Sequence, residues 1–254
     1  MEISVCMKAS RVPEFEKGDL RYIEIAAVDV ALSEKDDFAA LFKSIEQKEF
    51  EVISSYQFVY GDFDVCKGGY DRDYLQKYVT TVGDRLSALG CPKVVFGSGK
   101  ARSLDPEYGV EKGLSQFYDF LSISCDTLAR YGMTVVIEPL RSSETNFINR
   151  VNEGYDVAVK SGRDNCAVLC DYFHFTEEKE PWKDLEYAKD RLAHFHIAHP
   201  GDRDVPLPED GYDYSVLFGK LKKIGYDGFV SIEGKRRDPE TMKRSIAHLY
   251  SYIK

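Results

Sequence analysis

The sequence predicts an α/β fold of the TIM-barrel class, a (β/α)8 barrel. Short β-branched or apolar runs recur at intervals of roughly 30 residues, and about seven amphipathic helices lie between eight such runs. The 254 residues suit one barrel of this kind, and because no linker-like tract divides them we expect a single domain over residues 1–254. A doubly wound open sheet is the alternative, but eight repeats and a closing helix favour the barrel.

The first half of the chain supplies four strands and a short first connection. Strands are expected at residues 3–7, 22–26, 51–58 and 93–96. Only about a dozen residues join the first two strands, and they include Pro13 and Gly18, so the first helix is expected to be truncated. Residues 36–48 and 73–89 carry apolar side chains at helical spacing, and Gly90 closes the second of these helices.

The second half repeats the strand–helix pattern more regularly. Strands are expected at residues 134–138, 167–171, 192–197 and 228–233. Val135 to Ile137 form a β-branched run typical of a buried parallel strand, and Pro139 ends it because proline cannot donate to a ladder. Helices are expected over residues 111–131, 149–161, 181–190, 212–224 and 239–253.

Composition narrows the classes of function. A net charge of −9 argues against a nucleic-acid partner, because affinity for duplex DNA comes largely from basic side chains. No apolar run approaches the ~18 residues of a membrane span, and the N-terminus lacks the features of a signal peptide. The six cysteines form no CxxC pair. We therefore expect a cytoplasmic protein with reduced thiols and no membrane partner.

Four potential metal ligands stand at the ends of the last four strands. They are Glu138, Asp171, His196 and Glu233, separated by 33, 25 and 37 residues. Side chains at the carboxyl ends of barrel strands converge on the mouth of the barrel when they share the inward face. Three carboxylates and one imidazole suit Mn²⁺, Mg²⁺ or Co²⁺ with positions left open, whereas a structural zinc site would need more His or Cys. The pattern predicts one divalent metal ion.

The segments around these four residues resemble the xylose-isomerase-like TIM-barrel superfamily. The likeness is greatest to the D-tagatose/D-psicose 3-epimerases and the hydroxypyruvate-isomerase-like sugar epimerases, and it is strong from about residue 94 to 235. The motifs that carry it lie at residues 137–146, 170–174, 194–198 and 225–233.

The resemblance implies roles for individual residues. The same four ligands would hold the metal, and Glu138 and Glu233 would also be the catalytic acid–base pair. Glu144, His174 and Arg203 would contact the carbonyl end and hydroxyls of a small sugar substrate. The implied activity is that of a sugar or keto-sugar isomerase or epimerase, which moves a proton beside a carbonyl through a metal-bound enediolate. The resemblance also allows a homo-oligomer, since relatives are often dimers or tetramers.

Several details depart from this pattern or stay open. Arg203 lies one residue later than in ketose 3-epimerases, and His199 stands where the family often has Asp or Glu. His194 lies deeper than His196 and is interpreted as a structural hydrogen-bonding residue, while Glu24 is a candidate pocket residue at the end of its strand. The turn at residues 97–99 is no P-loop, so the absence of a phosphate motif favours an unphosphorylated sugar.

Three other functions are weighed against the isomerase. A sugar or cyclitol dehydratase would begin with the same proton abstraction and then expel a hydroxyl. A nuclease like endonuclease IV would need histidines across the whole barrel, yet all five lie in the last third of the chain. A non-catalytic accessory barrel would have no reason to keep all four ligands.

Overall fold

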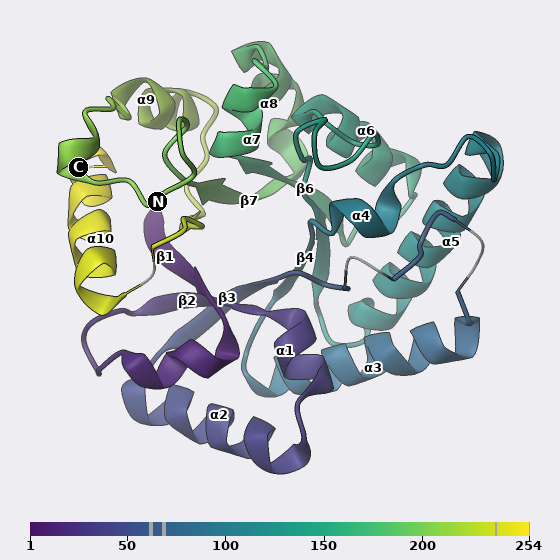
Figure 1. Cartoon of the computed structure of the whole chain (residues 1–254), viewed down its shortest axis with the longest axis horizontal. Coiled ribbons are helices and arrows are strands. Elements are labelled where there is room, and N and C mark those ends of the chain that lie inside the picture. The colour runs from purple at the N-terminus through teal and green to yellow at the C-terminus, as the bar shows by residue number, and fades with distance from the viewer. Residues whose placement is uncertain (61–62, 68–69, 237, 254) are drawn as a thin grey trace.

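The computed structural model describes residues 1–60, 63–67, 70–236 and 238–253. Its eight strands pair in sequence order and in parallel, and β1 (Glu2–Met7) pairs with β8 (Phe229–Ile232) to close the barrel. Figure 1 shows the strands as an inner ring with the longer helices outside it. The predicted (β/α)8 barrel is therefore confirmed.

The remaining strands lie where the sequence predicts them, with small differences at their ends. They are β2 (Tyr22–Ala26), β3 (Glu51–Tyr56), β4 (Lys93–Phe96), β5 (Thr134–Ile137), β6 (Cys166–Asp171) and β7 (Leu192–Ile197). β5 and β8 each end one residue earlier than expected, so Glu138 and Glu233 begin the loops that follow them. Pro139 accounts for the first of these ends, because it offers no N–H to a neighbouring strand.

The first connection contains only the 3₁₀ helix η1 (Ala9–Glu14), which confirms the truncated first helix. The α-helices with at least seven residues are α2 (Lys35–Lys48), α3 (Arg72–Ala88), α5 (Val110–Ala129), α6 (Val151–Lys160), α8 (Trp182–Ala188), α9 (Ser215–Lys223) and α10 (Pro239–Ile253) among the described residues. The helix expected over 181–190 divides into α8 and the 3₁₀ helix η2 (Lys189–Arg191). α9 begins three residues later than expected, because the Asp213 carboxylate accepts the Ser215 N–H and forms a turn just before the helix.

Three short helices that periodicity does not predict stand at the mouth of the barrel. They are α1 (Ala27–Leu32), α4 (Gly99–Arg102) and α7 (Tyr172–Glu177). Each is at most six residues long, too short to show a repeating apolar face. Because α1 and α7 follow directly on β2 and β6, and α4 comes two residues after β4, they fix how the chain leaves these strands.

The core has two parts that differ in chemistry. The larger part lies between the strands and the surrounding helices and is almost wholly apolar. The smaller lies inside the barrel and is built from modest side chains such as Val95, Val136 and Leu169. Buried polar groups share this interior: Ser4, Glu24, Ser54, His194, His196 and Ser231. A buried polar group is costly unless it is hydrogen-bonded, so this layer needs a function or a complete set of partners.

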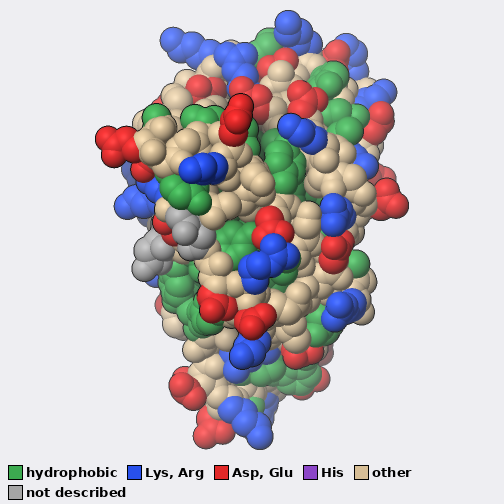
Figure 2. All heavy atoms as spheres, turned by 90° about the vertical axis from the view of Figure 1, so that its right-hand side faces the viewer, with side chains coloured by type: hydrophobic (Ala, Val, Ile, Leu, Met, Phe, Trp, Pro, Cys, Tyr) green, Lys and Arg blue, Asp and Glu red, His purple; other side chains and the backbone are tan. Residues whose placement is uncertain are grey.

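The outer surface carries charges of both signs. On the side that includes α5, Figure 2 shows acidic and basic side chains interspersed among smaller hydrophobic ones. Among the described residues, no helix combines the length and apolar character needed to span a bilayer.

Candidate metal centre

Glu138 is fixed through its backbone at the carboxyl end of β5. Its N–H donates to the Phe96 carbonyl at 3.2 Å, and its own carbonyl accepts from Nη2 of Arg102 at 2.6 Å. Arg102 is fully buried and also donates to the carbonyls of Phe96, Phe147 and Ile148. Burial lowers the pKa of this guanidinium to about 10, so it stays charged at neutral pH. One buried cation thus ties the ends of β4 and β5 together beneath the loops.

Asp171 is the last residue of β6 and also the N-cap of α7. Its Oδ1 accepts the backbone N–H of His174 at 3.1 Å, which leaves Oδ2 for another partner. Oδ2 is buried, and within the described part of the chain it has no hydrogen-bond partner. Burial, together with the nearby Glu233 and Glu138, raises the pKa of Asp171 to about 7. A buried carboxylate oxygen without a hydrogen-bond partner is one that a cation can bind.

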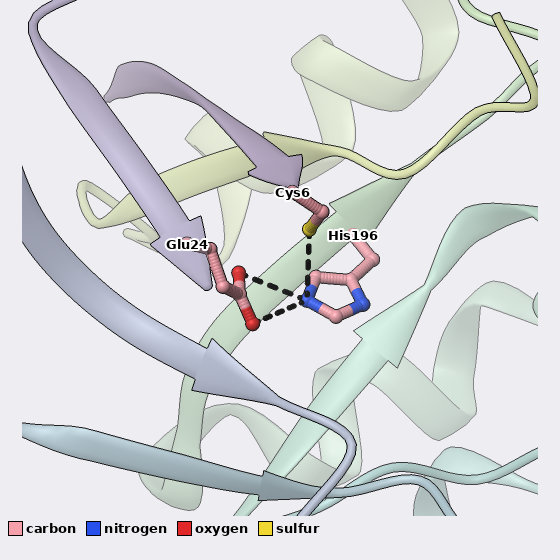
Figure 3. Close-up of side chains that lie close together, drawn as sticks. All are labelled: Cys6, Glu24 and His196. Atoms are coloured by element: carbon pink, nitrogen blue, oxygen red, sulfur yellow. Dashed lines mark hydrogen bonds and ion pairs between the residues drawn. The ribbon is translucent and has the colours of Figure 1, made fainter. Parts of the chain in front are cut away.

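His196 is held between two groups of carboxylates inside the barrel. Its Nδ1 faces Oε1 of Glu138 at 3.3 Å, whereas Nε2 lies 3.1 and 3.2 Å from the two carboxylate oxygens of Glu24 (Figure 3). The same carboxylate lies 2.7 Å from Nε2 of His194, which also contacts the Ser231 hydroxyl at 3.0 Å. The structural hydrogen bond predicted for His194 is therefore present. Glu24 lies below the mouth, where it contacts the histidines instead of lining the pocket as predicted.

The four predicted ligands meet at one point. Glu138, Asp171, His196 and Glu233 each offer a ligand atom, and these atoms lie within 4.8 Å of one another. Glu233 reaches this point from the loop after β8, where its N–H donates to the Ile197 carbonyl at 2.9 Å. The donor set is three carboxylates and one imidazole, which suits a hard divalent cation.

A second group of potential ligands shares His196 but suits a metal less well. Cys6 and Glu24 lie on the Nε2 side of the ring, with Sγ of Cys6 at 3.9 Å (Figure 3). Burial raises the pKa of the Cys6 thiol far above neutrality, and a protonated thiol is a poor ligand. Glu24 already accepts from two imidazoles. The Nδ1 side of His196 is therefore the side on which a metal fits.

The protonation states follow from burial and neighbouring charges. Burial works to raise the pKa of Glu24, but the two histidines outweigh it and hold that pKa well below its usual range. Burial alone would lower the pKa of His196, yet the Glu24 carboxylate raises it well above the ordinary value. Burial raises the pKa of Glu138. Carboxyl groups with raised pKa values thus surround the Nδ1 side of one imidazole, and a cation there would favour their ionised form.

Arg203 connects the metal centre to the rim. Its Nη2 lies 3.1 Å from Oε2 of Glu233 and its Nη1 3.3 Å from Oε1 of Glu144, which also accepts from Nε of Arg141 at 2.8 Å. The guanidinium carbons of Arg141 and Arg203 stand 4.9 and 5.2 Å from the ring centroid of Phe173. The backbone of Arg203 is left-handed, with φ of 60°, which is uncommon outside glycine and costs local strain.

His174 adjoins this group from α7. Its Nδ1 accepts the Arg141 N–H at 3.3 Å, so the ring proton of the neutral form resides on Nε2. Burial, and then the charge of Arg203, lowers the pKa of His174 to about 2. Nε2 is buried and finds no acceptor among the residues that the structure describes. A neutral donor without a partner is therefore available beside the metal ligands.

A cavity of about 490 Å³ opens above the four ligands. Its lining includes Glu138, Glu144, Arg203 and Glu233, together with Gln57 and Lys100. Gln57 follows β3 and, like Arg203, has a left-handed backbone with φ of 52°. Four of the seven predicted site residues thus line this cavity, whereas Asp171, His174 and His196 are buried and do not appear in its lining. Sequence reasoning missed Gln57, and the only signal for it is that it follows a strand.

Fold and site together define a (β/α)8 barrel in which three carboxylates and one imidazole, a possible metal site, converge at the carboxyl ends of the strands. The family model described as xylose isomerase-like TIM barrel matches residues 18–252, and the chain belongs to that family.

Relatives in this family have several different activities. The chain is 31% identical over 153 residues to 3-dehydro-D-guloside 4-epimerase from Escherichia coli K12, a match that covers 58% of this chain and 55% of that one. It is 30% identical over 154 residues to 2-oxo-tetronate isomerase from Haemophilus influenzae, covering 59% and 58%. The chain therefore spans less than two thirds of the length of these curated relatives.

Solved structures support the fold at lower sequence identity. A D-psicose 3-epimerase crystallised in the presence of D-fructose superposes with a TM-score of 0.84 at 17% identity, covering 100% of this chain and 99% of that one. At this identity the likeness concerns the fold alone.

Proposed function

We propose that this protein is a divalent-metal-dependent isomerase or epimerase of a sugar or keto sugar. The observation that carries the proposal is the convergence of Glu138, Asp171, His196 and Glu233, whose ligand atoms lie within 4.8 Å of one another. Two of the four, Glu138 and Glu233, also line the 490 Å³ cavity, so the same carboxylates can face a substrate. The isomerases and epimerases among the relatives are consistent with this chemistry.

A divalent ion fits the residues present. Carboxylate oxygens with one imidazole are ligands for Mn²⁺, Mg²⁺ or Co²⁺, and the buried Oδ2 of Asp171 has no partner within the described residues. When bound, such an ion supplies positive charge that stabilises the negative charge developing on a carbonyl oxygen. Metal analysis of the purified protein would identify the ion.

Glu138 and Glu233 are the proposed acid–base pair. Burial raises the pKa of Glu138, which brings this carboxyl closer to neutrality, where a general acid or base works best. Glu233 is more open, with its side chain 13% exposed, and the Arg203 guanidinium lies beside it. They come from β5 and β8, so one carboxylate can remove a proton beside the carbonyl while the other returns it on the opposite face. Return to the opposite face inverts the carbon, and return to the adjacent carbon isomerises the sugar.

Three residues are proposed to bind and orient the substrate. Nε2–H of His174 offers a neutral donor to a substrate oxygen, since its pKa of about 2 keeps the ring uncharged. Arg203 and Glu144 form an ion pair at 3.3 Å on the wall of the cavity, where a donor and an acceptor can each meet a hydroxyl. Their mutual contact holds both side chains in place before the substrate arrives.

The test is exchange of substrate hydrogen with solvent deuterium. Metal-loaded protein is incubated in D₂O with D-psicose, hydroxypyruvate, 2-oxo-tetronate and 3-dehydro-D-guloside, and deuterium at the carbon next to the carbonyl is followed by NMR. Exchange is expected with at least one compound, and Glu138→Gln and Glu233→Gln are each expected to slow it by about 10²- to 10⁴-fold.

Two measurements make the result decisive. Glu107→Gln, an exposed carboxylate in the loop after β4, serves as the matched control and should exchange at the wild-type rate. Metal content is measured for every variant, because Glu138 and Glu233 are ligands as well as acid–base groups. Wild-type exchange in both site variants would refute the proposal. A dehydrated product would instead assign the protein to the dehydratases, which share the first step.

A further inference from the structure

A second cavity, of about 530 Å³, adjoins the metal centre. It shares Arg203 and Glu233 with the first cavity, and also Tyr56 and Gln57. The residues that it does not share with the first cavity are Lys8, Arg11, Gly234 and Lys235. We call this second cavity the basic annex. One end of a substrate in the first cavity could therefore extend into the basic annex, whose lining carries more basic side chains than that of the first cavity.

The cations of the basic annex come from three neighbouring strand ends. Lys8 directly follows β1, Arg203 lies in the segment after β7, and Lys235 lies in the segment after β8. These strands are adjacent in the barrel, because β7 pairs with β8 and β8 pairs with β1. In (β/α)8 barrels the loops after strands seven and eight are a frequent phosphate-binding position. The annex thus occupies the part of the fold where anions are commonly held.

Backbone contacts fix the arrangement of the last two loops. The N–H of Lys235 donates to the Arg203 carbonyl at 3.1 Å, which joins the loop after β8 to the loop after β7. Gly234 lies between Glu233 and Lys235, and a Cβ there would stand 2.4 Å from the backbone nitrogen of Val205. The close approach of the two loops therefore requires glycine, and it holds Lys235 next to the proposed catalytic carboxylate.

The charges in the annex are unbalanced. Arg11 is paired with Glu14 at 2.6 Å, and Arg203 is paired with Glu144 and Glu233. Within the described chain, no acidic side chain forms an ion pair with the ammonium group of Lys8 or Lys235, although the Lys235 charge adds to the Asp204 N–H and His199 in lowering the pKa of Asp202. Four cations and one carboxylate in a single cavity contrast with the net charge of −9 and with the mixed charges on the face in Figure 2. Such a concentration attracts an anion.

We propose that the substrate carries an anionic group, a phosphate ester or a carboxylate, which binds in the basic annex between Lys8 and Lys235. This inference rests on the proposed function, because it takes the first cavity as the place where the reacting carbon lies. If the anion is a phosphate ester, it reverses the expectation of an unphosphorylated sugar. That expectation came from the absence of a contiguous motif, but basic side chains that three separate segments supply leave no such motif in the sequence.

The test compares three ligands with one carbon skeleton. D-fructose is neutral, D-fructose 6-phosphate carries a phosphate ester, and D-fructuronate carries a carboxylate at the same end. Affinities for Mn²⁺-loaded protein are measured by isothermal titration calorimetry, and at least one anionic ligand is expected to bind about tenfold or more tightly than D-fructose. The stronger of the two anions identifies the source of the charge.

Lysine variants test whether the preference for an anionic ligand arises in the basic annex. Lys8→Ala/Lys235→Ala is expected to remove the difference between anionic and neutral ligands, and Lys8→Glu/Lys235→Glu to reverse it. Lys43→Ala/Lys77→Ala, which changes two exposed lysines on α2 and α3, lowers the net charge equally and should keep the preference. Equal affinity for all three ligands would overturn the proposal, and so would an unchanged preference in Lys8→Ala/Lys235→Ala.

These outcomes are separable from the proposed reaction. Binding requires no turnover, so a lysine-dependent preference for an anion supports the annex even if no deuterium exchange is found. Exchange of neutral ketoses with no anion preference would support the reaction and refute the annex.

Discussion

The Glu24 carboxylate accepts from Nε2 of His196 at 3.1 Å and leaves Nδ1 of that ring turned toward Glu138. The two residues lie 172 positions apart, and both are fully buried inside the barrel. A metal-ligating histidine usually donates its other ring N–H to a carboxylate or carbonyl, which fixes the tautomer and the ring plane. Glu24 is thus a positioning residue for the proposed metal site.

Replacing Glu24 by Gln should weaken metal binding. The carboxylate accepts from both His194 and His196, whereas an amide has one oxygen and would turn its NH₂ toward one of the two rings. The expected loss is about 10- to 100-fold in Mn²⁺ affinity, measured by calorimetry on chelator-treated protein. Glu46→Gln, on the exposed face of α2, is the control, and equal affinities in the two variants would contradict the role of Glu24.

Gly97→Ala should displace a ligand without unfolding the protein. A Cβ at this position would stand 1.8 Å from Oε2 of Glu138, so the flexible carboxylate must move away. We expect Mn²⁺ affinity to fall about tenfold or more, while the thermal midpoint of the metal-free protein changes little. Gly219→Ala in α9 is the matched control, because its Cβ meets no atom within 4 Å. The Gly219→Ala control should raise the free energy of unfolding by about 0.5–1 kcal/mol and leave the Mn²⁺ affinity unchanged.

Arg102→Met should destabilise the fold. The fully buried guanidinium donates to four backbone carbonyls, and methionine would leave those acceptors unsatisfied. The expected loss is about 2–4 kcal/mol in the free energy of unfolding, measured by urea denaturation. Arg72→Met removes an ion pair whose arginine side chain is 65% exposed, and it should cost less than about 1 kcal/mol. Similar losses in both variants would argue against a stabilising role for the hydrogen bonds from Arg102 to the four carbonyls.

Glu180 gives stability a pH dependence away from the metal centre. Burial raises the pKa of this carboxyl to about 8, although it accepts the Val151 N–H at 2.8 Å. Between an unfolded value near 4.5 and the folded value, the native state binds the extra proton, so this group makes stability fall as pH rises through that window.

Glu180→Gln should remove that slope. Glutamine can still accept from Val151 but cannot ionise, so the variant is expected to gain on the order of 1–3 kcal/mol over wild type at pH 8 relative to pH 5. Urea denaturation across this range measures the difference. Parallel pH profiles of the two proteins would show that Glu180 does not titrate in this window.

The sequence carries enough information for the barrel and for the convergence of the four proposed metal ligands. Strand periodicity locates all eight strands, and the four ligands follow from their regular position at strand ends. Glu24 is harder to interpret, because its partners His194 and His196 lie five strands later in the chain order and the strand pattern alone does not say how deep a side chain points. The annex depends on three loops meeting, and loop geometry has no periodicity from which to predict it. Arg102 illustrates the same limit: its role is to satisfy carbonyls, and carbonyls are common to every residue.

The closure of β1 against β8 has a consequence for how the protein matures. His196 on β7 meets Glu24 on β2, and the annex takes Lys8 from β1 and Lys235 from beyond β8. Neither group of side chains can assemble until the two ends of the barrel have joined, a slow step because the contacts are distant in sequence. The four proposed ligands lie on or just after β5 to β8 and can gather earlier, but the Glu24 contact that orients His196 would form only when the ring is complete.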